Sequence, residues 1–179
     1  FLCKMSLRCQ NGFPSFRGED GIVFVSKRNV DKSDINAASF VPTYLDEDMN
    51  TRYFGDAKPS VDTPVQLRLY KLFPWANYML HAHCYVDTRG IIGAEMKFTS
   101  EPVPCGAIEE VSEIYKFIPK LITDVPGTVD MYNRNAPRLL AINLAGHGCI
   151  LIAKDTEIFK VLQTHKDNCF IPRPTPDYY

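Results

Sequence analysis

The apolar and polar positions of the chain follow two patterns, one typical of β-strands and one typical of α-helices. Short apolar runs rich in β-branched and aromatic residues predict strands, because such side chains pack well on a half-buried sheet. The predicted strands cover residues 21–26, 39–45, 51–54 and 77–86, and a pair joined by a tight turn lies within 139–152. Pro42 suggests a sheet edge or a bulge. The Asn, Gly and Pro residues of 11–20 instead predict turns.

Apolar residues spaced three or four positions apart predict helices, which alternate with the strands. In one of them Ile108, Val111, Ile114 and Tyr115 form a core-facing stripe, with glutamates such as Glu110 between them. The predicted helices run from Asp62 or Thr63 to Phe73, over 108–121 and over 155–162. Strands that alternate with helices indicate an α/β fold with a central sheet, in a single domain over residues 1–179.

Composition narrows the function classes without naming one. The chain has 179 residues with a net charge of −1, so no basic excess points to nucleic acid, and no apolar run is long enough to suggest a membrane span. None of the six cysteines forms a Cys-x-x-Cys pair, and Cys84 and Cys149 lie in apolar runs as small core residues. No signal peptide is evident. We therefore expect reduced thiols and a cytoplasmic protein.

Two histidines stand inside the predicted strand 77–86. Side chains two positions apart in a strand share one face, so His81 and His83 would present two imidazoles side by side. His147 lies in a Gly-flanked turn between two strands, whereas His165 ends a polar helical stretch. Neutral imidazole is the commonest zinc ligand. The alternative is a pair of hydrogen-bonded core histidines, which is harder to satisfy because each ring then needs its own partner.

Several separated motifs occur in an order that resembles the class II aldolase/adducin family. They are Lys58–Pro64, Leu69–Pro74, His81-Ala82-His83, Val103-Pro104-Cys105 and His147-Gly148. The family includes zinc-dependent fuculose-phosphate and rhamnulose-phosphate aldolases and ribulose-phosphate 4-epimerases. Asp62 lies 19 positions before His81, which is the family's spacing. The resemblance implies a three-layer α/β/α domain with a central, mainly antiparallel sheet, in a homotetramer.

The same resemblance implies a catalytic metal site. Its ligands would be His81, His83 and His147, holding Zn²⁺ or another divalent ion with one open position. The position of Asp62 carries Glu in the aldolases and Asp in the epimerases, on or near the metal. We therefore predict that Asp62 moves a proton while the metal stabilises the enediolate left by C–C cleavage. Its alternative role is a helix cap, and the two roles are compatible.

The substrate's acid group is less well defined. The resemblance places Ser15 and Ser60 at phosphate-binding positions, but Phe13 and Val61 replace other expected polar residues. Lys27 and Arg28 could supply charge in their place, and Asn29 could adopt the left-handed conformation of a glycine. A solvated basic turn is the alternative for this segment. The acid group can therefore be a phosphate or a carboxylate, or be absent.

We interpret the chain as a metal-dependent lyase of the class II aldolase type that acts on a small sugar or sugar phosphate. A 4-epimerase is the second enzyme interpretation, although Lys97 stands where the epimerases carry a proton-transferring Asp. Decarboxylases and dehydratases share the metal site. An adducin-like protein-interaction module is the non-enzyme alternative. Since adducin-like domains lack the full metal set, three histidines with Asp62 favour catalysis.

Overall fold

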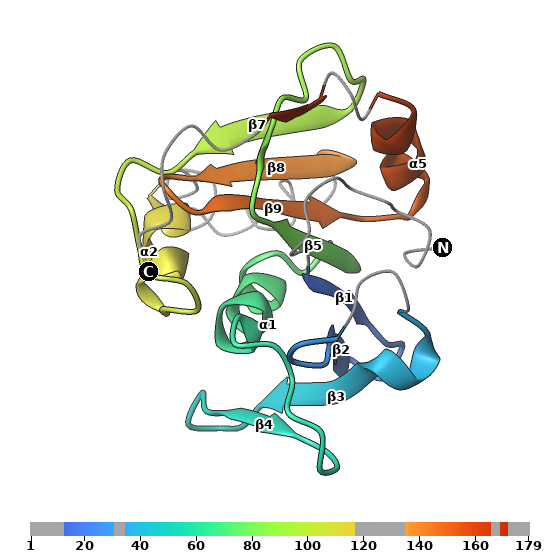
Figure 1. Cartoon of the computed structure of the whole chain (residues 1–179), viewed down its shortest axis with the longest axis vertical. Coiled ribbons are helices and arrows are strands. Elements are labelled where there is room, and N and C mark those ends of the chain that lie inside the picture. Colours follow the sequence, from blue (N-terminus) through green and yellow to red (C-terminus); the bar gives the residue numbers. More distant parts are fainter. Residues whose placement is uncertain (1–12, 31–34, 117–134, 166–168, 172–179) are drawn as a thin grey trace.

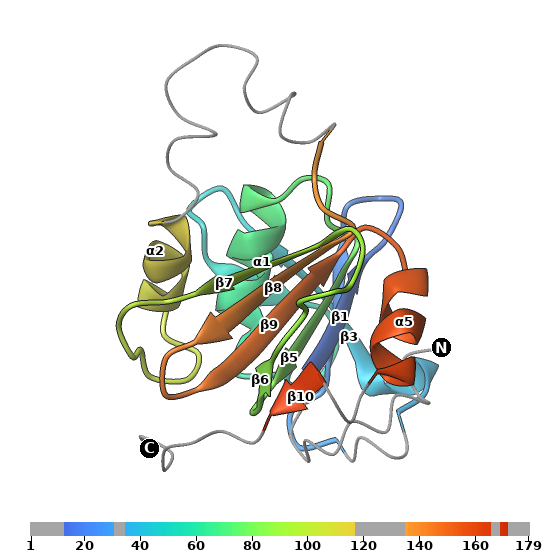
Figure 2. The same cartoon turned by 90° about the horizontal axis from the view of Figure 1, so that it is seen from above.

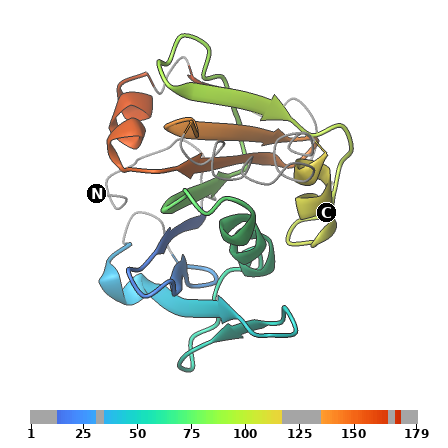
Figure 3. The same cartoon turned by 180° about the vertical axis from the view of Figure 1, so that it is seen from behind.

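The structure, a computed structural model, describes residues 13–30, 35–116, 135–165 and 169–171. Its centre is an eight-stranded sheet in the order β4-β3-β2-β1-β5-β9-β8-β7 (Figure 1; from behind, Figure 3). The strands of this sheet are β1 (Phe13–Arg17), β2 (Val23–Ser26), β3 (Phe40–Leu45), β4 (Thr51–Tyr53), β5 (Tyr78–Ala82), β7 (Ala94–Phe98), β8 (Leu139–Leu144) and β9 (Gly148–Ala153). Neighbouring strands pair antiparallel except β7 and β8, which are parallel. The predicted mainly antiparallel sheet is confirmed.

Helices cover both faces of the sheet. The helical segments are η3 (Ala37–Ser39), α1 (Thr63–Leu72), α2 (Glu109–Tyr115) and α5 (Glu157–Thr164). On one face Ile150 of β9 packs in a cluster with Leu69 of α1 and Ile114 of α2. On the other face Leu151 packs with Phe159 of α5, and Figure 2 shows these helices on opposite sides. Because both faces are covered, β8 and β9 are buried at every position and read as continuous apolar runs.

Two strands differ from the prediction in the first half of the sheet. The segment Phe13–Arg17, predicted as turns, forms β1 between β2 and β5. Pairing on both sides outweighs its poor local strand signal. Strand β3 is not at an edge, because it bonds to both β2 and β4. Pro42 has no backbone N–H to donate to a neighbouring strand. Its carbonyl still accepts a hydrogen bond from the backbone N–H of Phe54, so the residue is tolerated there.

The predicted strand 77–86 is interrupted between the two histidines, after Ala82. β5 ends at Ala82, residues 83–84 form a bend, and β6 (Tyr85–Val86) pairs with β10 (Phe170–Ile171) in a separate two-stranded sheet. The buried amide of Asn143 on β8 accepts from the Val86 N–H and donates to the Val86 carbonyl, each at 2.8 Å. His83 therefore lies in a bend, and the prediction of two histidines on one strand face is wrong in this respect.

The buried face of helix α2 matches the predicted one only in part, through Ile114 and the half-buried Val111. Its buried residues are Glu110, Glu113 and Ile114, whereas Ile108 and Tyr115 are 47% and 38% exposed. The predicted extension to residue 121 lies outside the described residues. No helix in the described ranges has the length and hydropathy of a membrane span.

The cysteines differ in their bonding. Cys84 is disulfide-bonded, whereas Cys105, Cys149 and Cys169 are free thiols. The expectation of reduced thiols is therefore wrong for Cys84, although Cys84 and Cys149 are both buried as predicted. The cytoplasmic setting stays a prediction.

Candidate metal centre

Three of the four histidines converge on the sheet face that carries α1 and α2. One ring nitrogen from each of His81, His83 and His147 lies within 4.8 Å of the others. The ring centroids are 4.6 to 5.2 Å apart, while His165 is exposed at the end of α5. This donor set fits a divalent ion, because three imidazoles leave a coordination position open for a small ligand. The structure thus brings together the three predicted ligands.

His81 is held as a neutral imidazole with a defined tautomer. Burial lowers its pKa to about 3, and the adjacent His147 and His83 act in the same direction, while Asp62 opposes them. Its Nδ1 lies 3.1 Å from the carbonyl oxygen of Cys149. A carbonyl can only accept, so Nδ1 carries the proton and Nε2 keeps its lone pair. A neutral Nε2 is the form that a metal requires.

His147 is positioned by the β8–β9 turn. The N–H of Ala145 donates to the Thr99 hydroxyl at 2.8 Å, and the N–H of Gly146 donates to the Tyr85 hydroxyl at 3.0 Å. The Nδ1 of His147 lies 3.1 Å from the Glu110 carboxylate, and both side chains are buried. Burial raises the pKa of Glu110, whereas the contact with His147 lowers it. These contacts fix the histidine from both its backbone and its side chain.

Asp62 stands beside the histidines but outside their cluster. It occupies the N-cap position of α1 without a side-chain capping bond, so the predicted cap role is not realised. Its carboxylate instead accepts from the Cys105 thiol at 3.3 Å and from the Ser60 hydroxyl at 3.4 Å. The residue is 5% exposed, and its charge acts on His81. These two contacts take the place of a capping bond, and a role of Asp62 in proton transfer stays a prediction.

The Cys105–Asp62 contact predicts slow modification of this thiol. Burial raises the pKa of Cys105 to about 12, and the charge of Asp62 and its hydrogen bond contribute in the same direction. Only the thiolate reacts, so iodoacetamide should label Cys105 faster in Asp62→Asn than in the parent protein. Each unit of lowered pKa gives about tenfold more thiolate at fixed pH. Peptide mapping by mass spectrometry measures the rate, with buried Cys149 as the internal control, and equal Cys105 rates would contradict the contact.

The predicted substrate residues divide into two groups. The turn of Lys27, Arg28 and Asn29 docks beside the segment before α1, because Arg28 N–H donates to the Lys58 carbonyl and Ser60 N–H donates to the Ser26 carbonyl. Asn29 has φ of 59°, which confirms the expected left-handed conformation. Ser15 is fully buried on β1, with its hydroxyl 3.2 Å from that of Tyr70. Substrate binding by these residues stays a prediction.

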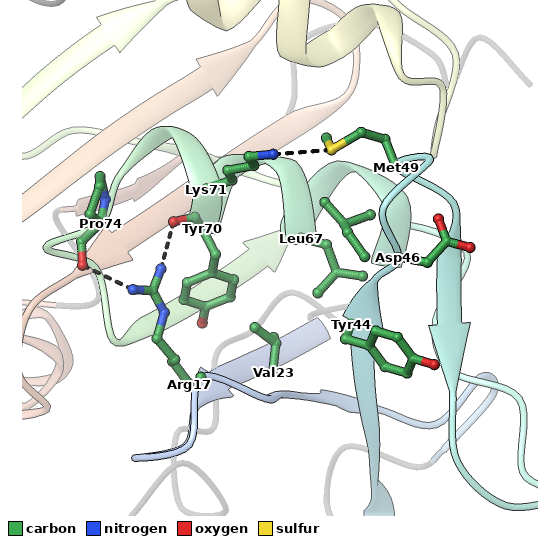
Figure 4. Close-up of a pocket in the computed structure, with 11 residues that line it drawn as sticks. Arg17, Val23, Tyr44, Asp46, Met49, Leu67, Tyr70, Lys71 and Pro74 are labelled. Atoms are coloured by element: carbon green, nitrogen blue, oxygen red, sulfur yellow. Dashed lines mark hydrogen bonds between the residues drawn. The ribbon is translucent and has the colours of Figure 1, made fainter.

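A separate cavity of about 470 Å³ lies at the other end of α1 (Figure 4). Its cations are engaged within the protein: Arg17 donates to the carbonyls of Tyr70 and Pro74, and Lys71 contacts the Met49 sulfur. Arg17 thereby caps the carbonyl end of α1. None of the clustered histidines lines this cavity, so we assign it no part in the candidate site.

Glu110 and Cys105 are the site residues to which sequence reasoning assigns no role. The helical pattern places Glu110 with the charged residues between the apolar positions of α2. One signal is available in the sequence: Glu110 and Ile114 are four residues apart, so they share a helix face, and Ile114 lies on the apolar stripe. An acid on a core-facing stripe needs a buried partner. The sequence does not indicate that this partner is His147.

Comparison with known proteins agrees with this architecture. A family described as Class II Aldolase and Adducin N-terminal domain matches residues 4–161. An L-fuculose 1-phosphate aldolase superposes with a TM-score of 0.58 at 16% identity, covering 98% of this chain and 85% of that one. The l-fuculose-1-phosphate aldolase of Thermus thermophilus gives 0.53 at 14%, covering 90% and 82%.

A sugar-phosphate aldolase of Thermotoga maritima gives a TM-score of 0.56 at 10% identity, covering 89% of this chain and 84% of that one. At these identities the likenesses establish the fold. A comparison with curated proteins gives no significant match. The family match is independent of these superpositions and spans most of the sequence, and it confirms the resemblance inferred from the motifs. This chain belongs to the class II aldolase and adducin N-terminal domain family.

Proposed function

We propose that this protein is a zinc-dependent lyase of the aldolase type that cleaves or forms a C–C bond in a small hydroxy-ketone. The observation that carries the proposal is the convergence of His81, His83 and His147 beside the buried carboxylate of Asp62. Membership of the class II aldolase and adducin family supports an aldolase-type activity. The fold shared with fuculose-phosphate aldolases is consistent with it.

The residues of the site divide the chemistry between them. A divalent ion held by the three imidazoles would supply Lewis-acid stabilisation for the negative charge that develops when a C–C bond beside a carbonyl breaks. Asp62 moves the proton at a substrate hydroxyl, and its carboxylate is oriented by Ser60 and Cys105. The buried setting of His81 and Asp62 excludes water from the proton acceptor.

The substrate we propose is a phosphorylated ketose. Arg28 and the neighbouring Lys27 lie beside Ser60, whose hydroxyl reaches Asp62, so the basic turn and the proton acceptor are linked through one short segment. Guanidinium and ammonium groups bind phosphate or carboxylate well. The homotetramer expected of the family remains part of the proposal, and light scattering of the purified protein tests it.

The alternatives have less support from particular residues. An epimerase would need an acid where Lys97 stands, and Lys97 instead lies on edge strand β7, in an ion pair with Glu95 at 2.7 Å. An adducin-like module would not require three clustered histidines with a buried acid. We therefore place the lyase first.

Metal content is the test of the proposal. We expect about one zinc per chain in the purified protein by elemental analysis, and its loss in a His81→Ala/His83→Ala double variant. The matched control is His165→Ala, because His165 is exposed and outside the cluster, so zinc content should equal the parent's. If the parent neither contains zinc nor takes it up, the lyase fails and the interaction module replaces it.

Substrate screening follows once the metal is established. Phosphorylated ketoses, their unphosphorylated forms and the corresponding carboxylates should be offered to the zinc-loaded protein, with aldehyde release as the readout. The basic turn predicts cleavage of the phosphorylated or carboxylated compounds first. Equal turnover of the uncharged sugars would remove Lys27 and Arg28 from the site while leaving the lyase intact.

A further inference from the structure

One buried acid at the centre has no part in the chemistry described above. Glu110 lies in the first turn of α2, is 4% exposed, and places its Oε2 3.1 Å from Nδ1 of His147. The same helix buries Ile114 in the core against α1, so α2 is anchored and its first turn is fixed over the histidine. The contact therefore joins a rigid helix to a turn residue that is 37 positions away in sequence.

Because Glu110 is buried, its carboxylate needs a hydrogen-bond donor from within the protein. A carboxylate loses much hydration in the interior and is retained there when a donor compensates. Among the described residues, the hydrogen-bond partner of the Glu110 carboxylate is His147. Glu113, one turn later on the same helix, instead contacts Ser100 and the partly exposed Lys116. Two acids on one helix face thus have different partners, one in the candidate metal centre and one near solvent.

The direction of the hydrogen bond defines the state of His147. When the Glu110 carboxylate is ionised it only accepts, so Nδ1 of His147 then carries the proton and Nε2 presents its lone pair. His81 reaches the same state through the Cys149 carbonyl. Two of the three clustered rings are therefore held in the same tautomer by different acceptors. Unlike a carbonyl, the Glu110 carboxylate also adds negative charge, which increases the basicity of the ring it contacts.

We propose that Glu110 is the positioning residue of His147, which it holds in the orientation and tautomer needed to bind the metal. This inference rests on the proposed metal-dependent function. Glu110 does not contact the metal or the substrate in this assignment, because its carboxylate is directed at the far nitrogen of the ring. Glu110 increases the metal affinity of the site. It does so by orienting His147, and its negative charge partly balances the charge of a divalent ion.

The test compares variants of neighbouring acids on one helix. Glu110→Ala removes the acceptor, Glu110→Gln keeps an uncharged acceptor of the same shape, and Glu113→Gln is the matched control. Each apo protein is titrated with zinc against a chromophoric chelator and with cobalt while its visible absorption is recorded. Far-UV circular dichroism and thermal unfolding of the apo forms report the fold separately.

We expect Glu110→Ala to bind zinc about 10–100-fold more weakly and to show an altered cobalt spectrum. Glu110→Gln should fall between this variant and the parent, because its amide oxygen still accepts from Nδ1. Glu113→Gln should match the parent in both metal readouts. Should Glu110→Ala fail to fold, Glu110→Gln alone decides, since it conserves the volume of the side chain.

Three results would overturn the inference, and they can be told apart. If the parent binds zinc and both Glu110 variants bind it equally well with the same cobalt spectrum, Glu110 is a structural residue and the metal site stands. If the parent binds neither zinc nor cobalt, the metal site fails and the inference fails with it. A loss shared equally by Glu110→Gln and Glu113→Gln would assign the effect to α2 packing and also overturn the inference.

Discussion

Gly148→Ala is expected to destabilise the protein by about 3 kcal/mol or more and to abolish zinc binding. A Cβ at this position would lie 2.1 Å from the Ala82 carbonyl oxygen and 2.9 Å from Cα of His83. Both atoms belong to backbone, so no side chain can rotate to make room. Relief requires β5 and β9 to separate at the point between His83 and His147, and this displaces the ligands together with the strands.

The control for Gly148 is a glycine whose replacement meets no neighbour. Gly90 has φ of 85° and no atom within 4 Å of the place that a Cβ would take, so Gly90→Ala costs about 1–2 kcal/mol of backbone strain. Urea unfolding of both apo variants and zinc uptake at room temperature make the comparison. Gly90→Ala should keep its metal. A Gly148→Ala protein with parental stability and zinc content would show that the two strands do not approach this closely.

Local sequence predicts some parts of this fold and misses others. β2, α1, the β8–β9 pair and α5 carry strong apolar patterns, and each lies close to its predicted bounds. The prediction misses β1 because Pro14 and nearby turn residues hide a segment whose strand state comes from pairing with β2 and β5. It also misses the bend after Ala82, because this bend depends on distant Asn143, which holds Val86.

The candidate site shows the same division. Residue type and motif order are enough to select His81, His83, His147 and Asp62, because both can be read directly from short stretches of the sequence. They do not select Glu110, because α2 is amphipathic in sequence but buries Glu110 and Glu113 in the structure. The role of Glu110 depends on His147, which reaches it from another element of the fold. Ligands follow from chemistry, whereas the groups that orient them follow from tertiary contacts.

Asp62→Asn is expected to lower kcat for C–C cleavage by about 10²–10⁴-fold while leaving zinc content and thermal unfolding near those of the parent. The amide has the same shape. Its one oxygen can still accept from Cys105, and its NH2 group can donate to the Ser60 hydroxyl oxygen, so residue 62 keeps a contact with each neighbour. What is lost is the ability to take up a proton. Asp62→Glu should restore part of the rate, because it keeps the carboxylate one methylene further from the backbone.

A second acid shows whether the loss is specific to residue 62. Asp56→Asn is the matched control, since Asp56 is an exposed acid in the loop before α1 and should keep the parental rate. Parental turnover by zinc-loaded Asp62→Asn would exclude Asp62 from the mechanism, and the base would then have to be sought among the other acids near the histidine cluster.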